Sequence, residues 1–563
     1  ATRRSLLDKG LIECEERVAV PGPAVCHQGP PLSPEQAAAL DALQAADPGF
    51  AVSLLHGVTG SGKTEVYLRL IARQLEAGRQ VLILVPEIGL TPQLMGRLQA
   101  RFDAHIAALH SGLADGARQT AWEAARSGQA HIVVGTRSAI FCSLANPGLI
   151  VVDEEHDPSF KQQDGFRYSA RDLAVKRGQL EDVPVLLGSA TPSLETLQNA
   201  RAGRYRWLRL TQRVGSSQLP GIDVVDIRRS PLDGGLSEAL LQRICSEVDS
   251  GQQVLLFLNR RGYAPTLQCH DCGYIASCRH CDARLTLHRR ANELRCHHCD
   301  WRLPIPRQCP DCGSRALNAR GVGTERTEEA LRRHFPGLPV HRVDRDSMQR
   351  QNAMAELVAE VQAGEPCILL GTQMLTKGHH FPAVTLVGLL DTDAALFSGD
   401  FRGPERMGQL LTQVAGRAGR AERPGEVILQ THYPDHPLLL TLLEAGYDQF
   451  AGELLEERHR NGLPPFAPLA MVRAEANSPE RAEGFLAALR RALERGNAPV
   501  QLIGPLPAPL QRKSGRFRAQ LLLRGRARAP FRKTLETLVS AAEDLPDSKR
   551  LRWSLDVDPI DTL

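Results

Sequence analysis

The residues best suited to chemistry in this chain form a loop from Gly57 to Thr64 with the pattern Gly-x-x-x-x-Gly-Lys-Thr. In such a loop the glycines let backbone N–H groups surround phosphate oxygens. Lys63 is expected to neutralise the β- and γ-phosphates of ATP, and Thr64 to bind Mg²⁺. An apolar run precedes the loop and a helical pattern follows it, as this chemistry requires. The residues expected to bind the nucleotide are Gly57, Gly60, Ser61, Gly62, Lys63 and Thr64.

A second group of residues has the types needed to hydrolyse the bound triphosphate. Asp153 and Glu154 follow a short apolar run, so we expect Asp153 to hold Mg²⁺ and Glu154 to polarise the attacking water. A solvated acidic turn is the alternative, but an apolar strand leading into four polar residues favours a site. Gln413 lies near two arginines, Arg417 and Arg420, which are expected to stabilise charge on the γ-phosphate.

Eight of the 13 cysteines form four Cys-x-x-Cys pairs. In a long chain without a secretory signal this spacing indicates two structural Cys₄ zinc sites in a reducing compartment. The pairs are Cys269/Cys272, Cys278/Cys281, Cys296/Cys299 and Cys309/Cys312. A predicted hairpin over 284–296 would join the second pair to the third and leave the first and fourth for the other site. Sequential pairing, first with second and third with fourth, is the alternative.

Size and composition limit the class of protein. The chain has 563 residues, too many for one core, and its 42% hydrophobic and 23% charged residues are ordinary for a globular protein. The net charge of +4 is small, so overall charge says little about nucleic acid. No run of about 18 apolar residues occurs, so we expect no membrane-spanning segment. We also expect no signal peptide, and a cytoplasmic location.

The candidate site residues must be positioned by alternating strands and helices. Apolar runs that fit buried parallel strands alternate with helical patterns over residues 51–205, and a second series begins at 254. The sequence therefore predicts an α/β fold with two tandem lobes. Ser33, Pro34 and Gln36 predict a capping box that opens the first helix.

The predicted domains follow the breaks in these patterns. We expect the tail of a winged-helix domain over 1–20, a linker over 21–34, lobe 1 over 35–205, lobe 2 over 206–263 and 317–460, a zinc module over 264–316, and an α+β domain over 461–563.

Four motifs, Asp153–His156, Gly188–Thr191, Gly371–Pro382 and Gln413–Arg420, together resemble those of superfamily-2 helicases with two RecA-like lobes. The amino-acid sequences of these motifs are most similar to those of the PriA family of primosomal replication-restart helicases. The resemblance covers nearly the whole chain, and the zinc block sits where the family has it, with nested pairing. Of the family's N-terminal DNA-binding part, only the tail of the winged helix has a counterpart here.

This resemblance implies an ATP-dependent 3′→5′ DNA helicase that remodels stalled or repaired replication forks and initiates primosome assembly. It implies ATP, Mg²⁺ and two Zn²⁺ as cofactors, with Gly378 at the nucleotide. Forked and single-stranded DNA would be bound, and single-stranded DNA-binding protein and other primosome proteins would be partners. We expect a monomer without membrane association. Ser189 and Thr191 would relay the nucleotide state, and Thr136 and Arg137 would contact the DNA backbone.

Two further segments have the composition of nucleic-acid contacts. Phe160, Phe166 and Tyr168 lie among basic residues and suit stacking on unpaired bases, although ordinary core packing is the alternative. Residues 512–533 contain nine Lys/Arg and no Asp/Glu, with two phenylalanines, Phe517 and Phe531 among them. We expect a phosphate-binding face there, or a surface for an acidic peptide of a partner.

Two other functions fit the same motifs. The chain would act as a primosome-loading scaffold if its ATP hydrolysis were dispensable. It would be an RNA-directed motor if RNA rather than DNA stimulated hydrolysis.

Overall fold

The structure is a computed structural model, and it describes residues 24–45, 49–86, 91–214, 220–258, 267–280, 284–288, 293–296, 301–319, 324–343, 353–371, 381, 383–398, 400–416 and 425–562. Contacts divide the chain into two units. The first consists of Ala1–Gln162, Tyr168–Ser189 and Gly203–Gln212, and the second of Gln163–Arg167, Ala190–Ala202 and Arg213–Leu563.

The first unit is built on a parallel sheet with seven strands among its described residues, in the order β5-β6-β3-β7-β8-β2-β9. These are β2 (Val52–Gly57), β3 (Gln80–Leu84), β5 (Ile106–Leu109), β6 (Ile132–Gly135), β7 (Pro147–Asp153), β8 (Val185–Ser189) and β9 (Arg206–Leu210). Side chains such as Leu54 and Ile150 are fully buried, as expected for strands covered on both faces. The predicted alternation of strands and helices is confirmed.

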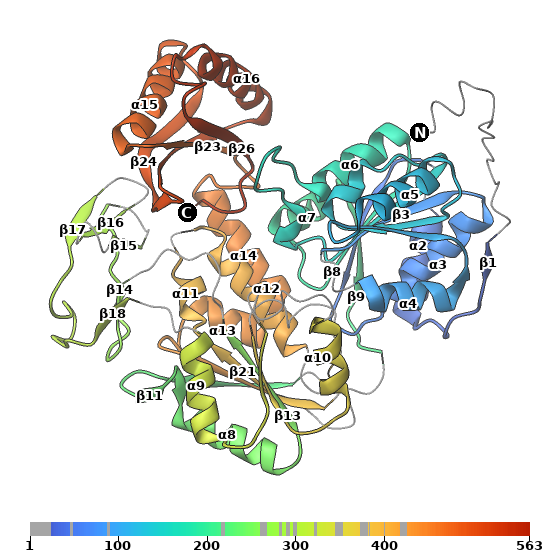
Figure 1. Cartoon of the computed structure of the whole chain (residues 1–563), viewed down its shortest axis with the longest axis horizontal. Helices are drawn as coiled ribbons and strands as arrows, with labels where there is room; N and C mark the ends of the chain where they lie inside the picture. Colours follow the sequence, from blue (N-terminus) through green and yellow to red (C-terminus); the bar gives the residue numbers. More distant parts are fainter. Residues whose placement is uncertain are drawn as a thin grey trace, which may run out of the picture. The chain divides into compact units, whose positions relative to one another are not determined.

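The remaining elements of the first unit surround this sheet (Figure 1). They are β1 (Val25–Cys26), β4 (Phe102–Asp103), α2 (Pro34–Gln44), α3 (Lys63–Glu76), α4 (Thr91–Arg101), α5 (Asp115–Arg126), α6 (Ala170–Glu181) and two short 3₁₀ helices, η2 (Arg137–Phe141) and η3 (Pro158–Phe160). The capping box of α2 is present. The Gln36 backbone N–H donates to Ser33 Oγ at 3.3 Å, and the Ser33 backbone N–H donates to Gln36 Oε1 at 2.9 Å.

The second unit contains a parallel sheet that has six strands in the described part of the chain, in the order β10-β22-β21-β13-β20-β19. These are β10 (Gly221–Asp226), β13 (Gln253–Leu258), β19 (Val340–Val343), β20 (Ile368–Gly371), β21 (Val384–Leu390) and β22 (Glu426–Thr431). Two short strands, β11 (Leu232–Asp233) and β12 (Leu236–Ser237), form a separate antiparallel pair and lie between β10 and β13 in the sequence. The helices are α7 (Leu194–Arg201), α8 (Glu238–Asp249), α9 (Thr324–His334), α10 (Ala353–Gln362), α11 (Asp393–Leu396), α12 (Gly403–Ala415), α13 (Pro437–Glu444) and α14 (Gly446–Arg460).

Two smaller antiparallel assemblies complete the second unit. The cysteine-rich segment contains a pair, β14 (Leu267–Cys269) with β18 (Leu317–Ala319), and a three-stranded sheet of β15 (Thr286–His288), β16 (Glu293–Arg295) and β17 (Arg302–Pro304). The C-terminal domain is a sheet in the order β24-β25-β23-β26, with α15 (Pro479–Arg495) and α16 (Arg528–Asp544) against it (Figure 1). Its strands are β23 (Leu469–Ala476), β24 (Val500–Lys513), β25 (Arg516–Gly525) and β26 (Arg552–Val557).

The structure moves two of the predicted boundaries. The first lobe was expected to end at 205, but β9 pairs with β2 and therefore extends the first sheet to Leu210. The zinc module was expected to end at 316, but β18 pairs with β14 and extends it to Ala319. Both strands are short and pair only with partners distant in sequence, which periodicity cannot reveal. The predicted winged-helix tail, 1–20, lies outside the described residues.

Part of the predicted linker has a defined place. Val25 and Cys26 form β1, which pairs antiparallel with β4 of the first unit. None of the helices in the described ranges has both the length and the apolarity needed to cross a bilayer.

Candidate active site

The phosphate loop joins β2 to α3, as predicted. Lys63 is the first residue of α3, and Gly62 precedes it with φ 76°, a left-handed conformation that favours glycine. A Cβ atom on Gly57 would lie 2.4 Å from Ser61 Oγ, so the turn also needs glycine at its start. The Lys63 ammonium donates to the Gly57 carbonyl at 2.7 Å, which holds the lysine over the loop.

Two hydroxyls in the loop fit a phosphate ligand. Thr59 Oγ1 and Ser61 Oγ are both buried and have no hydrogen-bond partner within the described part of the chain. A buried polar atom without a partner is costly, and phosphate oxygens would supply acceptors for both. The residues present therefore fit a nucleotide triphosphate in this loop.

Gln36 supports the loop in a way that sequence reasoning missed. Its side chain is buried, and Nε2 donates to the Ser61 carbonyl at 2.8 Å. The capping box identified Gln36 only as a helix-start residue. The oxygen of this buried amide accepts from the Ser33 N–H at the start of α2, and its nitrogen donates to the phosphate loop. The Gln36 side chain therefore fixes the loop against α2.

Asp153 ends β7, where the sheet brings it close to the phosphate loop. It accepts a hydrogen bond from the Tyr67 hydroxyl at 3.1 Å, a contact that no sequence pattern indicated. Gly188 on the neighbouring strand β8 leaves room for this hydroxyl, because a Cβ there would lie 1.6 Å from it. Burial and the Glu154 charge together raise the pKa of the Asp153 carboxyl to about 6, although Lys63 and the Tyr67 hydrogen bond oppose the shift. A divalent cation would replace the water that this carboxylate has lost, so the site fits Mg²⁺.

The raised pKa of Asp153 predicts a pH-dependent affinity for Mg²⁺. The carboxyl is protonated below about pH 6, so each pH unit below that value should weaken Mg²⁺ binding to the nucleotide-bound protein about tenfold. Calorimetric Mg²⁺ titrations between pH 5 and 8 would measure this. The Asp153→Asn variant is the control, since its remaining pH dependence belongs to the nucleotide itself. Equal Mg²⁺ affinity of the unmodified protein at pH 5 and pH 7, after that correction, would contradict the prediction.

The rest of the acidic motif connects to the end of β8. Glu154 has φ 48°, and its Oε2 lies 3.6 Å from His156 Nδ1. His156 Nδ1 also lies 2.7 Å from Ser189 Oγ. Within the first unit, a polar contact and a hydrogen bond, both at His156, therefore connect the expected water-polarising carboxylate to the residue expected to relay the nucleotide state.

Thr191, two residues after Ser189, belongs to the second unit and contacts α12. Gln413 Nε2 donates to Thr191 Oγ1 at 3.3 Å, and Gln409 Nε2 donates to the Thr191 carbonyl at 3.5 Å. The structure thus brings Gln413 to the Gly188–Thr191 motif. Arg417, Arg420 and Gly378 lie outside the described residues.

A buried charged cluster anchors α7 on the first turn of α12, and sequence reasoning missed it. Glu405 accepts from the Leu194 backbone N–H at 3.0 Å and from Arg458 Nη2 at 2.7 Å. Arg402 Nη2 lies 2.7 Å from a carboxylate oxygen of Glu195. Sequence spacing gave no signal, because the partners come from three separate helices.

Four cysteine sulfurs meet in the zinc module. The Sγ atoms of Cys269, Cys272, Cys309 and Cys312 all lie within 4.8 Å of one another. The Cys269–Cys312 distance is 3.7 Å and the Cys272–Cys309 distance is 3.6 Å. Zn–S bonds of about 2.3 Å in a tetrahedron place sulfurs about 3.8 Å apart, so this cluster fits one Zn²⁺. This set is the one that nested pairing predicts for the first site.

The second predicted zinc site is described only in part. The strands β15 and β16 pair antiparallel, so the predicted hairpin is present. Cys278 and Cys296 are buried in the cluster that holds this hairpin together. Cys281 and Cys299 lie outside the described residues.

The zinc module is fixed to the sheet of the second unit through two histidines. His270, beside Cys269, has Nδ1 3.1 Å from His432 Nε2. His432 Nδ1 lies 3.0 Å from Asp393 Oδ2, and both groups are buried. The contact continues through the Tyr433 hydroxyl, which donates to the Gly273 carbonyl.

Three aromatic residues were expected to stack on unpaired bases, and for one of them, Phe160, the prediction is wrong. Phe160 is 2% exposed and packs in the core, because η3 turns it inward. Phe166 is 77% exposed. Tyr168 contacts Phe141 edge-on, with ring centroids 4.9 Å apart. Arg137, expected on DNA, has Nη1 donating to the Ser159 and Lys161 carbonyls, both at 3.1 Å.

The basic segment of the C-terminal domain is likewise only partly available to a ligand. Phe531 is buried against Gly525, whereas the Arg512 guanidinium lies 5.2 Å from the Phe517 ring centroid. A hollow of about 480 Å³ lies along the N-terminal turns of α16. It is lined by Arg528, Ala529, Arg532, Lys533 and Glu536.

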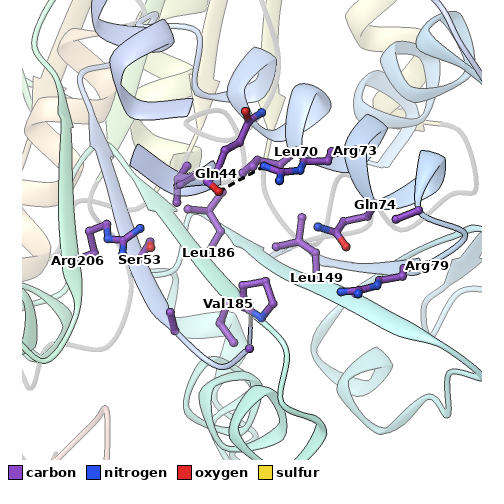
Figure 2. Close-up of a pocket in the computed structure, with 16 residues that line it drawn as sticks. Gln44, Ser53, Leu70, Arg73, Gln74, Arg79, Leu149, Val185, Leu186 and Arg206 are labelled. Atoms are coloured by element: carbon purple, nitrogen blue, oxygen red, sulfur yellow. Dashed lines mark hydrogen bonds between the residues drawn. The ribbon is translucent and has the colours of Figure 1, made fainter. Parts of the chain in front are cut away.

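Another hollow, of about 380 Å³, lies in the first unit at the amino ends of β2, β7 and β8 (Figure 2). Arginines at its rim, including Arg73 and Arg206, surround an apolar floor that includes Leu149 and Leu186. The phosphate loop and Asp153 lie at the opposite, carboxyl ends of the same strands, so this hollow is not the nucleotide site.

Comparisons with known proteins agree with this arrangement. Residues 33–200 match the DEAD/DEAH box helicase family, 278–304 the PriA DNA helicase Cys-rich region domain, and 459–560 the Primosomal protein N C-terminal domain. The replication restart protein PriA of Haemophilus influenzae is 50% identical over 91% of this chain and 70% of its own length. The proteins of the same name from Synechocystis and Bacillus subtilis are 40% and 37% identical, over 100% and 94% of this chain and 69% and 66% of theirs.

The chain thus spans 66% to 70% of the length of these three relatives. Along the chain, the three family matches coincide with the first parallel sheet, the cysteine-rich segment and the C-terminal sheet. This chain belongs to the PriA family of replication restart proteins.

Proposed function

We propose that this chain is an ATP-dependent DNA helicase that moves 3′→5′, remodels stalled or repaired replication forks and initiates primosome assembly. The observation that carries the proposal is the geometry at the carboxyl edge of the first sheet. There Lys63 lies close enough to Asp153 to lower its pKa against the effect of burial, beside two buried hydroxyls that lack partners. This is an arrangement for a triphosphate and its metal, within a chain of the PriA family.

In this proposal each residue has a defined role. Lys63 and the backbone N–H groups of the loop bind the triphosphate, Asp153 and Thr64 hold Mg²⁺, and Glu154 accepts a proton from the attacking water. Gln413 senses the result through Thr191, to which it is hydrogen-bonded. Further residues proposed at the nucleotide are Gly378, Arg417 and Arg420.

The zinc module and the C-terminal domain would carry the interactions with DNA and partners. We propose two structural zinc ions, held by Cys269, Cys272, Cys309 and Cys312 and by Cys278, Cys281, Cys296 and Cys299. Forked and single-stranded DNA would be the substrates. Arg528 and Arg532, in the first two turns of α16, suit an acidic peptide of a partner such as single-stranded DNA-binding protein, since a helix N-terminus adds to their positive charge. We propose a cytoplasmic monomer.

The proposal is tested by the nucleic acid that stimulates ATP hydrolysis. ATPase rates measured with forked DNA, single-stranded DNA, duplex DNA and RNA should rise most with forked and single-stranded DNA. Stimulation by RNA alone would indicate an RNA-directed motor. Hydrolysis that no polynucleotide stimulates, in a protein that still binds Mg-nucleotide, would overturn the motor proposal and leave the scaffold.

A further inference from the structure

The residues that follow β26, 559–562, are bonded to the C-terminal sheet and are named the strap here. Arg473 on β23 lies directly opposite Gln520 on β25 in the register of the sheet. Arg473 Nη2 donates to the Asp561 carbonyl at 3.0 Å, and Gln520 Nε2 donates to the Thr562 carbonyl at 3.4 Å. The neighbours of Arg473 along β23 pack with α15 and α16 in the apolar core. Since side chains alternate across a strand, the strap lies on the opposite face of this sheet.

The other side of the strap is bonded to the residues that precede α12. The Thr562 hydroxyl donates to Asp400 Oδ1 at 3.1 Å, and Arg402 Nε donates to the Pro559 carbonyl at 3.2 Å. Asp400 is fully buried, Arg402 is 8% exposed, and Pro559 is buried as well. A buried polar group that loses a hydrogen-bond partner costs free energy. Movement of the strap away from α12 would therefore be unfavourable at both Asp400 and Arg402.

Asp400 also sets the start of α12. Its Oδ1, which accepts from Thr562, accepts in addition from the Arg402 backbone N–H at 3.2 Å. Its Oδ2 lies 3.1 Å from Nη1 of Arg406, in the first turn of the helix. Negative charge beside a first turn is favourable, because the N-terminus of a helix carries partial positive charge. One buried carboxylate therefore joins the strap to α12.

The second half of α12 carries the residues that contact the Gly188–Thr191 motif. Gln409 and Gln413 both donate to Thr191. The helix has 13 residues and is therefore about 20 Å long. A helix whose internal bonds are intact moves as one body, so a shift at its start also displaces Gln413. The strap, Asp400, α12 and Thr191 all belong to the second unit.

We propose that the strap positions α12 for ATP hydrolysis, with Thr562 as the positioning residue. Its bond to Asp400 holds the start of the helix, and the helix holds Gln413 at Thr191 in the arrangement that hydrolysis requires. A segment that only closed the C-terminal domain would need contacts with the sheet alone, whereas this one also bonds to a buried carboxylate at the start of α12. The inference rests on the proposed function, because it assumes that Gln413 takes part in hydrolysis.

The test compares T562V with T562S in the full chain. Valine keeps the size of threonine but cannot donate to Asp400, whereas serine keeps the hydroxyl. With saturating single-stranded DNA, T562V should lower kcat for ATP hydrolysis about threefold to tenfold, the factor that corresponds to one lost hydrogen bond. The KM for ATP should not change, because the phosphate loop is untouched. T562S should keep the kcat of the unmodified protein. The control, T537V, removes a hydroxyl that donates to the Lys533 carbonyl on α16, and it should change neither value.

Hydrogen exchange measures the hold of the strap on α12 without depending on catalysis. Exchange over the first half of α12 should be at least about threefold faster in T562V than in T562S, with no difference over β23 and β25. Equal exchange in the two variants would overturn the inference. Faster exchange with an unchanged kcat would also overturn it, since the strap would then only stabilise the fold.

The two measurements also separate this inference from the proposed function. If no polynucleotide stimulates hydrolysis by the unmodified protein, the proposed function fails, and the exchange rates still decide whether the strap holds α12. If DNA stimulates hydrolysis and T562V has the same kcat as T562S, only this inference fails.

Discussion

Replacement of Lys63 by alanine is expected to lower the maximal ATPase rate at least about 1,000-fold. The Lys63 ammonium is the positive group of the loop, and it lies close enough to Asp153 to oppose the rise of that carboxyl's pKa. Without it, the negative charge that spreads over the transferred phosphoryl oxygens would lose its strongest protein partner. Removal of one such group in a water-excluded site typically costs two to three orders of magnitude or more in rate. Steady-state ATPase assays with saturating single-stranded DNA would measure the loss.

The matched control for Lys63 is another lysine of the same unit. Lys176 lies on α6, where its ammonium donates to the side-chain oxygen of the exposed Gln179 at 2.9 Å, so Lys176→Ala should hydrolyse ATP at the normal rate. Retention of more than a tenth of the activity in Lys63→Ala would show that this loop does not carry hydrolysis. If Lys63→Ala lost unwinding but still supported primosome assembly, the chain would act there as a scaffold.

Replacement of Cys309 by serine is expected to remove one zinc ion and unfold the ribbon that it holds. Burial raises the pKa of the neighbouring Cys272 thiol to about 12, as do hydrogen bonds from the other thiols, so this cluster is poorly suited to exist as thiolates without a cation. Structural zinc sites are worth on the order of 10 kcal/mol in folding free energy. If the chain holds the two proposed ions, zinc content should fall from two to one per chain, and hydrogen exchange should accelerate over β14 and β18.

The same substitutions distinguish the two pairings. In the nested arrangement Cys269 and Cys309 bind one ion, so the Cys269→Ser/Cys309→Ser double variant should still hold one zinc. In the sequential arrangement these residues serve different ions, and the double variant would hold none. Cys245, an exposed thiol on α8, is the control, and Cys245→Ser should retain the full zinc content.

We propose that nucleotide state is carried along the chain from Ser189 to Thr191, where the contacts with α12 begin. Ser189 is bonded to His156 of the acidic motif, and Thr191, two residues on, is bonded to Gln413. Glu405 and its partners then hold the following helix, α7, on α12. The buried charges around Glu405 would resist separation of these helices, since breaking one pair leaves an unpaired charge in the core.

The sequence by itself determined the nucleotide loop, the acidic strand end, the cysteine pairs and the alternation of strands and helices. Each of these depends on residues that lie within a few positions of one another, where backbone geometry fixes what spacing means. Lys63 must begin a helix after a glycine turn, and Asp153 must end a buried strand, whatever the rest of the chain does.

Only the tertiary structure decided the contacts between residues far apart in the chain. Tyr67 on Asp153, Gln36 on the phosphate loop, Glu405 on α7 and Thr562 on Asp400 join segments whose local patterns are ordinary. Phe160 and Phe166, six residues apart and alike in sequence context, separate into a core residue and an exposed one. Burial depends on which surfaces meet, and that follows from the free energy of packing the whole chain rather than from any local period.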